Sequence, residues 1–299
     1  MKEKAIKHLS LNLNNYLRSR YTADTVKAYE REIMIFLGNV PGAEKAVYND
    51  LVNYLGSLRQ RYSNGNTINR VLAGIKVYYD FLNHIGQRKD NPARSIRLRD
   101  KRSSDIQLQD LFSTEELEGL LNRKERYNNL ILRNKALMSL LIYQALHPKE
   151  IEALTMADIN LEQGSIYIRA TPKTNSRELA LKPPQIMLFY RYIYESRKHL
   201  LENKGADSVV FLVGQRGERM KAEDITKHIQ RSCKGLFKGR RVNARTIRQS
   251  VICNLLKAGN DLRLVQTFAG HKYPSTTEMY KQNDVEVLQS AINRFHPMQ

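Results

Sequence analysis

The sequence has no tryptophan and only two cysteines, Cys233 and Cys253, among its 299 residues. Two cysteines cannot form a disulfide framework, and they lie too far apart along the chain for the CxxC spacing of a zinc site. Cys253 lies in the apolar run VICNLL, which is typical of a core residue, although a nucleophilic cysteine stays an alternative. This cysteine usage excludes a disulfide-stapled scaffold and indicates a reducing compartment.

Long apolar runs are also missing. The first twenty residues, MKEKAIKHLSLNLNNYLRSR, lack the apolar segment of a signal peptide, and no later stretch is long enough to cross a bilayer. Glycine (15) and proline (8) are sparse while 41% of the residues are apolar, which is typical of a folded chain. We therefore expect a soluble, cytoplasmic protein, and two modest domains are the working hypothesis.

Acidic residues are outnumbered by basic ones. The chain has 30 Asp and Glu and 49 Lys and Arg, which gives a net charge of +19. Such an excess attracts a polyanion, and nucleic acid is the commonest polyanion that a protein meets. A solvated basic surface and an anionic membrane are the alternatives. No lipidation motif and no basic amphipathic terminal helix supports a membrane partner, so the charge favours nucleic acid.

The first ninety residues show apolar positions at helical spacing and no convincing strand. Thr22 and Thr67 are candidate N-caps for two of the helices. The apolar faces predicted behind them comprise Val26, Tyr29, Ile33 and Phe36 in the first helix and Ile68, Val71, Leu72, Ile75, Tyr79 and Leu82 in the second. Residues 1–90 are therefore predicted to form a small helical bundle.

A basic segment with little apolar content follows, and it includes Arg97 and Arg99 in the stretch GQRKDNPARSIRLRDKRSSD. Its composition predicts an interdomain linker over residues 91–110. A tether this basic suits contact with phosphates, so Arg97 and Arg99 are candidate DNA-binding residues, although a solvated spacer is an equal alternative.

Residues 111–299 are predicted to form a second domain that is mainly helical with a small sheet. Ser113 and Glu116 form a capping-box pattern, and Pro148 suits the first turn of a helix. Alternating segments, SIYIRA and RELAL, flank the turn TPKTNS and predict a β-hairpin. Further predicted elements are a long helix over 130–146, a short strand VVFLV, and helices around 222–236, 244–258 and 261–269.

Residues 231–248, RSCKGLFKGRRVNARTIR, are basic and contain no acid. Without a countercharge nearby in the sequence, Lys238, Arg240 and Arg241 are candidate DNA-binding residues. Arg245 and Arg248 are three residues apart, so they share a helix face and suit bidentate contact with phosphate oxygens. A surface pair, or an ion pair with a nearby acid, is the alternative.

The segment AGNDLRLVQTFAGHKYPSTTEMYKQ follows, and with it the chain resembles the tyrosine recombinases, or phage integrase family. In that family an arginine, a histidine in a Gly-His pair and a tyrosine form half of the active site. Here Arg248, His271 and Tyr280 match, with His271 placed 23 positions after Arg248 and Tyr280 nine positions after His271. The segments TVKAYEREI, TINRVLAGIKVYYDFL and ALHPKEIEALTMADIN extend the resemblance to nearly the whole chain, at the length of a two-domain, Xer-like member.

The resemblance implies a SAM-like, helical core-binding domain before a mixed, mostly helical catalytic domain. It implies cleavage and rejoining of double-stranded DNA at a specific site through a 3′-phosphotyrosyl intermediate, without metal or other cofactor, by a tetramer associated with the nucleoid. Tyr280 would be the nucleophile, Arg248 a phosphate clamp, His271 a hydrogen-bond donor, and Lys173 in the hairpin turn the acid for the leaving oxygen. The C-terminal tail is expected to form a helix that docks on a neighbouring subunit or on its own domain.

Two positions depart from the family pattern. His147 stands where the family has its first arginine, after Ala145-Leu146 in place of a Gly-Leu pair, and Arg245 stands where it has its first histidine. We hypothesise that Arg245 restores the charge that His147 lacks. The alternatives are a DNA-binding accessory protein of the same fold with impaired catalysis and, more remotely, a helical RNA-binding protein.

Overall fold

A computed structural model defines residues 12–99, 111–123, 125, 127–202, 209–237 and 239–281. The chain divides into two compact units, Met1–Ser104 and Asp105–Gln299. Over the defined ranges helices predominate and the strands form one small sheet, so the predicted mainly α fold class is confirmed. No helix in these ranges combines the length and the apolar character that crossing a bilayer requires.

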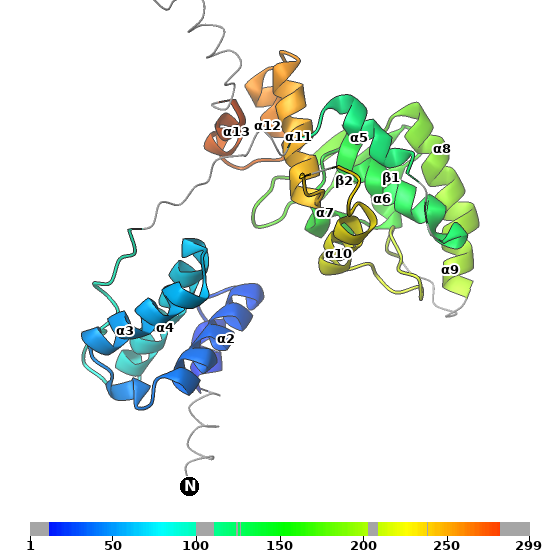
Figure 1. Cartoon of the computed structure of the whole chain (residues 1–299). Helices are drawn as coiled ribbons and strands as arrows, with labels where there is room; N and C mark the ends of the chain where they lie inside the picture. The colour runs from blue at the N-terminus through cyan, green and yellow to red at the C-terminus, as the bar shows by residue number, and fades with distance from the viewer. Residues whose placement is uncertain are drawn as a thin grey trace, which may run out of the picture. The chain divides into compact units, whose positions relative to one another are not determined.

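The defined part of the first unit is helical (Figure 1). Residues 12–18 are helical, and α2 (Ala23–Asn39), the 3-10 turn η1 (Ala43–Lys45), α3 (Tyr48–Arg61) and α4 (Gly65–His84) follow. Thr22 is the N-cap of α2 as predicted, but its hydroxyl contacts the Thr25 hydroxyl at 3.0 Å and caps no backbone amide. The prediction for Thr67 is wrong, because Asn64 caps α4 by accepting a hydrogen bond from the amide of Asn66.

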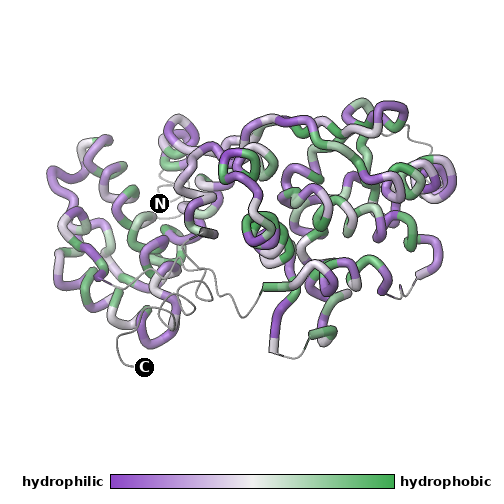
Figure 2. Tube along the Cα trace, turned by 90° about the horizontal axis from the view of Figure 1, so that it is seen from above, coloured by the Kyte–Doolittle hydropathy of each residue, from purple (hydrophilic) through white to green (hydrophobic). Residues whose placement is uncertain are grey.

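The predicted apolar faces of α2 and α4 form the core of this unit, and Tyr29 alone among the predicted residues stays partly exposed. Figure 2 shows apolar and polar positions alternating along the helices, as burial of one face requires. Ala93 and Ile96 from the predicted linker are also buried in this core, and the Lys76 ammonium donates to the carbonyl of Ile96. The linker therefore begins as a packed segment, while its exact bounds remain a prediction.

The second unit contains most of the helices predicted for it. Ser113 and Glu116 form the predicted capping box, and Pro148 opens a helix, also as predicted. The long apolar helix ends at Tyr143, three residues earlier than expected. The helices are α5 (Thr114–Leu121), η3 (Asn128–Leu130), α6 (Ile131–Tyr143), α7 (Pro148–Ala153), η4 (Met156–Asp158), α8 (Pro183–Arg191), the π-helical turn η5 (Tyr192–Arg197), α9 (Lys198–Glu202), α10 (Ala222–Ser232), α11 (Ala244–Lys257), α12 (Leu262–Ala269) and α13 (Pro274–Lys281).

The sheet has three antiparallel strands in the order β1-β2-β3. They are β1 (Ile159–Asn160), β2 (Ser165–Ile168) and β3 (Arg177–Ala180). The predicted hairpin is confirmed, since Ile166 pairs with Leu179 and Ile168 pairs with Arg177. The strand predicted for VVFLV is wrong. That segment makes only isolated bridges, such as Val210 with Thr155. The side chains of residues 210–213 are buried in an irregular segment, whereas Val209 is exposed.

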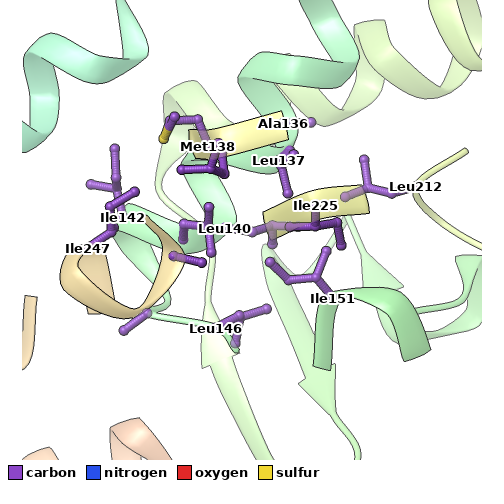
Figure 3. Close-up of a cluster of buried hydrophobic side chains, with 14 of the residues drawn as sticks. Ala136, Leu137, Met138, Leu140, Ile142, Leu146, Ile151, Leu212, Ile225 and Ile247 are labelled. Carbon is purple, nitrogen blue, oxygen red and sulfur yellow. The ribbon is translucent and has the colours of Figure 1, made fainter. Parts of the chain in front are cut away.

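The core of the second unit lies around α6, which is apolar on most sides. Leu137, Leu140 and Leu141 have no exposed surface, and Figure 3 shows Leu140 between Ile225 of α10 and Ile247 of α11. A helix surrounded in this way fixes the elements packed on it, because a close-packed interior tolerates little displacement. Helix α7, which follows the predicted site residue His147, and helix α11, which carries Arg245 and Arg248, are thus held against a common core.

Helices α11, α12 and α13 lie together at one end of the second unit (Figure 1). Asn243 caps α11 and Asp261 caps α12, each through its side-chain oxygen and two backbone amides. Gly270 ends α12 with φ of 70°, a left-handed conformation that favours glycine and turns the chain sharply. His271 therefore emerges at the corner between α12 and α13.

Candidate active site

Arg248 lies in α11 with only 8% of its surface exposed. Its Nη1 donates to the carbonyl of Ala145 at 2.5 Å, and its Nη2 donates to the carbonyl of Ala269 at 2.6 Å. The nearest carboxylate is that of Glu150, 3.6 Å from Nη1. Burial lowers the pKa of Arg248, and the negative charge of Glu150 opposes the shift. The guanidinium is thus held in one orientation by neutral oxygens, with an anion close by.

His271 is also buried, and its Nδ1 lies 2.8 Å from the hydroxyl of Thr277. Burial lowers the pKa of His271 to about 4, and the charges of Arg248 and Arg177 add to the shift. At neutral pH the imidazole is therefore uncharged and has one N–H to donate. This suits a hydrogen bond to a phosphate oxygen.

Tyr280 lies in α13, where its ring stacks on His271 with centroids 6.1 Å apart and an angle of 15° between the planes. Burial raises the pKa of the Tyr280 phenol, and the charge of Arg248 opposes this shift. The hydroxyl therefore keeps its proton at neutral pH. The three residues that carry the family resemblance therefore lie close together, because the charge of Arg248 acts on both His271 and Tyr280 and the two rings stack.

The hairpin turn brings Lys173 to the same corner. The amide of Asn175 donates to the carbonyl of Gly270 at 2.8 Å, and Thr174 forms a β-bridge with His271. Within the turn, the Thr171 and Thr174 hydroxyls lie 2.8 Å apart. Lys173 directly precedes the bridging residue and is exposed, so its ammonium is accessible at the edge of the site.

His147 is the N-cap of α7, where its Nδ1 accepts a hydrogen bond from the amide of Lys149 at 3.2 Å. Desolvation lowers the pKa of His147, and the positive charges of Arg248 and Lys173 lower it further. The residue is also exposed. His147 is therefore a neutral imidazole in the same field as Arg248, with one ring nitrogen committed to the helix cap.

Arg245 is exposed in the first turn of α11, one turn before Arg248. Its positive charge acts on the Tyr280 phenol, whose pKa it lowers, after the larger contribution of Arg248. Arg245 and Arg248 thus act on the same phenol but differ in burial.

The residues predicted to bind DNA outside this cluster have different surroundings. The Arg240 guanidinium binds the carboxylate of Glu116 and lies over the rings of Phe112 and Phe237. The countercharge of Arg240 thus comes from α5, outside the basic segment, which itself contains no acid. Arg241 is exposed, as are Arg97 and Arg99 in the first unit, whereas Lys238 and the C-terminal tail lie outside the described residues.

Sequence reasoning missed two buried residues of the cluster, Glu150 and Arg177. They form a bidentate ion pair in which Arg177 Nη1 lies 2.8 Å from Glu150 Oε1. Glu150 follows His147 by three positions and accepts a hydrogen bond from its amide, which is the capping-box spacing and was a usable signal. Arg177 had no such signal, because an arginine in a short alternating strand favours the exposed face. In the parts of the chain that the structure describes, no group of three His, Cys, Asp or Glu could hold a metal ion.

The comparisons with known proteins cover nearly the whole chain. Residues 111–286 match the phage integrase family and residues 13–86 match the phage integrase N-terminal SAM-like domain. The chain is 26% identical to tyrosine recombinase XerD of Listeria monocytogenes, over 92% of this chain and 93% of that protein. It is also 26% identical to tyrosine recombinase XerC of Alcanivorax borkumensis, over 93% and 89%.

Solved structures share the fold at low sequence identity. The Tn1549 transposon integrase in complex with transposon right-end DNA has a TM-score of 0.67 at 18% identity, with coverage of 96% of this chain and 99% of that chain. XerH recombinase bound to its difH substrate has a TM-score of 0.65 at 19% identity, with coverage of 89% and 78%. Since the family match spans more than half of the residues, this chain belongs to the phage integrase family.

Proposed function

We propose that the protein is a site-specific DNA recombinase that breaks and rejoins strands through Tyr280. The observation that carries the proposal is the meeting of Arg248 from α11, His271 from the corner between α12 and α13, and Tyr280 from α13 within one partly buried cluster. A packing tyrosine would need none of these neighbours. The names of the relatives, tyrosine recombinases and integrases, agree with this reading.

The reaction needs no external energy source. The Tyr280 phenolic oxygen forms a bond to the DNA phosphorus while the bond from phosphorus to the 5′-oxygen breaks, and a 3′-phosphotyrosyl linkage results. The phenolic proton leaves as the new bond forms, and the departing 5′-oxygen takes up a proton. A 5′-hydroxyl from another strand then attacks the same phosphorus, which releases the tyrosine and rejoins the DNA.

Fixed donors stabilise the charge that develops on the phosphate. Arg248 is oriented by the carbonyls of Ala145 and Ala269, so it needs little reorganisation to serve as a clamp. Neutral His271 donates one hydrogen bond. Lys173, exposed on the turn beside His271, is the acid that protonates the leaving oxygen.

The substitution of the family's first arginine by His147 removes a permanent positive charge and a bidentate hydrogen-bond donor. Loss of one such donor costs on the order of 10² to 10³ in rate. We propose that Arg245 supplies a compensating charge, and its effect on the pKa of Tyr280 supports this placement. The neutral His147 is accordingly a weak contributor.

Double-stranded DNA with a specific recombination site is the proposed partner. The exposed Arg241, Arg97 and Arg99 suit contact with phosphates, which positions the protein without reading sequence. The family resemblance favours a tetramer of identical or related subunits on DNA, since recombination joins four strand ends.

The test is a nicked suicide substrate, on which the wild-type chain should form a covalent protein–DNA adduct that survives denaturation. Tyr280→Phe should abolish the adduct while it retains DNA binding. Tyr273→Phe is the matched control, because Tyr273 lies in the same segment with 70% of its surface exposed. An adduct that persists in Tyr280→Phe would overturn the assignment of the nucleophile.

The second candidate is a DNA-binding accessory protein of the same fold, and His147 is the observation that favours it. That reading predicts specific binding to duplex DNA with no adduct from the wild-type chain under any tested metal-free condition. A preference for RNA over duplex DNA in the same binding assay would contradict both readings.

A further inference from the structure

We propose that Arg177 is a positioning residue for strand cleavage, because it holds Glu150 and so leaves the charge of Arg248 available to a DNA phosphate. This inference rests on the proposed function and adds to it a residue that does not touch DNA. It starts from a buried cluster in which two guanidinium groups share one carboxylate.

Arg177 is buried, with 3% of its side chain exposed, and protein groups occupy most of its donors. Nη1 and Nη2 donate to the two oxygens of Glu150 at 2.8 and 3.3 Å. Nε donates to the carbonyl of Phe268 at 2.7 Å, and Nη1 also reaches the carbonyl of Asn175 at 3.3 Å. A guanidinium engaged in this way has no free fork for a phosphate, so Arg177 cannot be a second clamp.

The Glu150 carboxylate is fully buried and lies between the two arginines. Its bidentate pair is with Arg177, whereas its nearest oxygen is 3.6 Å from Arg248 Nη1. The Arg248 Nη atoms donate instead to uncharged carbonyl oxygens. Two cations and one anion leave one net positive charge in the cluster, and it resides on Arg248.

Without Arg177 this balance changes. A buried carboxylate that loses its partner is strongly driven to find another, and Arg248 is the nearest cation. Glu150 would then pair directly with Arg248 and neutralise the clamp. The charge of Arg177 thus acts on the reaction through Glu150, at a distance from the phosphate.

Arg177 also links the parts of the site. It begins β3, directly after the turn that carries Lys173, and its Nε binds the last turn of α12, next to Gly270. A Cβ built on Gly270 would collide with the Arg177 guanidinium, whose Cζ would be 2.9 Å away. The same side chain therefore sets the distance between the Lys173 turn and the His271 corner.

The test compares Arg177→Met with the double variant Arg177→Met/Glu150→Gln on the suicide substrate. The single variant should form the covalent adduct about 100-fold more slowly than wild type, since Glu150 would then pair with Arg248 and take that preorganised donor from the phosphate. The double variant should recover about tenfold, because glutamine cannot neutralise Arg248. Its amide oxygen can still accept from the His147 amide. If Arg177 had a purely structural role, replacing its buried partner Glu150 as well would lower the adduct rate further.

Arg177→Lys is the conservative variant, and it should keep most of the activity because a positive charge remains beside Glu150. Arg197→Met is the matched control. Arg197 is another buried arginine of the same unit, and it binds the carbonyls of Val210 and Phe211. Its loss should lower the thermal midpoint but leave the adduct rate of the folded protein unchanged.

A readout without DNA separates this inference from the proposed function. The pKa of His271, followed by NMR, should rise from about 4 in Arg177→Met and return toward its original value in the double variant, since Arg177 lowers it and Glu150 raises it. If wild type forms no adduct, the proposed function fails while this measurement still tests the cluster. The inference would be overturned if folded Arg177→Met formed the adduct at the wild-type rate. It would also be overturned if the double variant formed the adduct no faster than the single variant.

Discussion

The imidazole of His271 lies nearly parallel to the phenol of Tyr280, with ring centroids 6.1 Å apart. A charged imidazole in this buried place, close to Arg248, is unfavourable, and the pKa of His271 is accordingly lowered to about 4. The stacked pair is therefore suited to a neutral imidazole. This has a consequence for stability as well as for chemistry.

Stability should fall in mild acid because of His271. A histidine in the unfolded chain has a pKa of about 6.5, so between about pH 6.5 and pH 4 the unfolded state binds more protons than the folded state. The contribution of the neutral imidazole is complete above about pH 6.5 and is lost as the pH falls toward 4. His271 should contribute about 1 to 2 kcal/mol to the loss of unfolding free energy between pH 7 and pH 5, measured by urea unfolding.

His271→Asn should reduce this pH dependence, because asparagine does not titrate. His228 also has its pKa lowered to about 4 by burial, so His228→Asn should reduce it separately. If His271→Asn left the slope of unfolding free energy against pH unchanged, the lowered pKa of His271 would be wrong.

Ala145 has φ of 49°, a conformation that costs most non-glycine residues about 1 to 2 kcal/mol. It follows α6, and the amide of Leu146 closes the helix end on the carbonyl of Leu140. Ala145→Gly should relieve the strain but lose a buried methyl and gain chain entropy when unfolded, so we expect a net change within about 1 kcal/mol. Ala136→Gly, buried inside α6, has no strain to relieve and should cost about 2 kcal/mol. Equal losses in urea unfolding would contradict the strain at Ala145.

Gly270 and Gly259 both have positive φ near the ends of helices, yet only Gly270 lies against a guanidinium. Gly259→Ala should cost about 1 kcal/mol, from the backbone conformation alone. Gly270→Ala should cost at least about 2 kcal/mol more, because its Cβ meets Arg177. In an Arg177→Met background the extra cost should shrink. A cost at Gly270 that is independent of residue 177 would show that the backbone conformation alone matters.

The sequence predicted the elements well where a local pattern determines them. The capping box at Ser113 and the hairpin around Lys173 depend on neighbours in the chain, and both were found. The match of Arg248, His271 and Tyr280 came from the resemblance to the family, whose spacing these residues share. What it missed depends on contacts between residues far apart in the chain: Glu116 binds Arg240 from 124 positions away, and Arg177 binds Glu150 from 27 positions away. Burial of an ion pair leaves no periodic signal in either partner.

Arg245 should matter for cleavage more than its exposure suggests. Arg245→Ala should slow adduct formation on the suicide substrate on the order of 10²-fold, because it removes the charge proposed to compensate for His147. Arg263→Ala removes another exposed charge, from α12, and should have little effect. In a His147→Arg background, which restores the family's arginine, Arg245→Ala should cost much less. Equal costs in both backgrounds would show that Arg245 does not compensate for His147.

Arg240 and Arg241 are adjacent in sequence, but replacing Arg240 should lower stability, whereas replacing Arg241 should weaken DNA binding. Arg240 is held by Glu116, the carbonyl of Leu111 and two phenylalanine rings, so Arg240→Ala should lower the unfolding free energy by about 1 kcal/mol and leave the salt dependence of DNA binding nearly unchanged. Arg241 is exposed, so Arg241→Ala should leave stability unchanged within about 0.5 kcal/mol. It should also weaken DNA binding at low salt and reduce the slope of log K against log salt by about one. Urea unfolding and a salt titration of duplex binding, applied to both variants, separate a role in stability from a role in DNA binding. A reduced salt slope in Arg240→Ala would show that the Arg240 guanidinium contacts DNA despite its partner in α5.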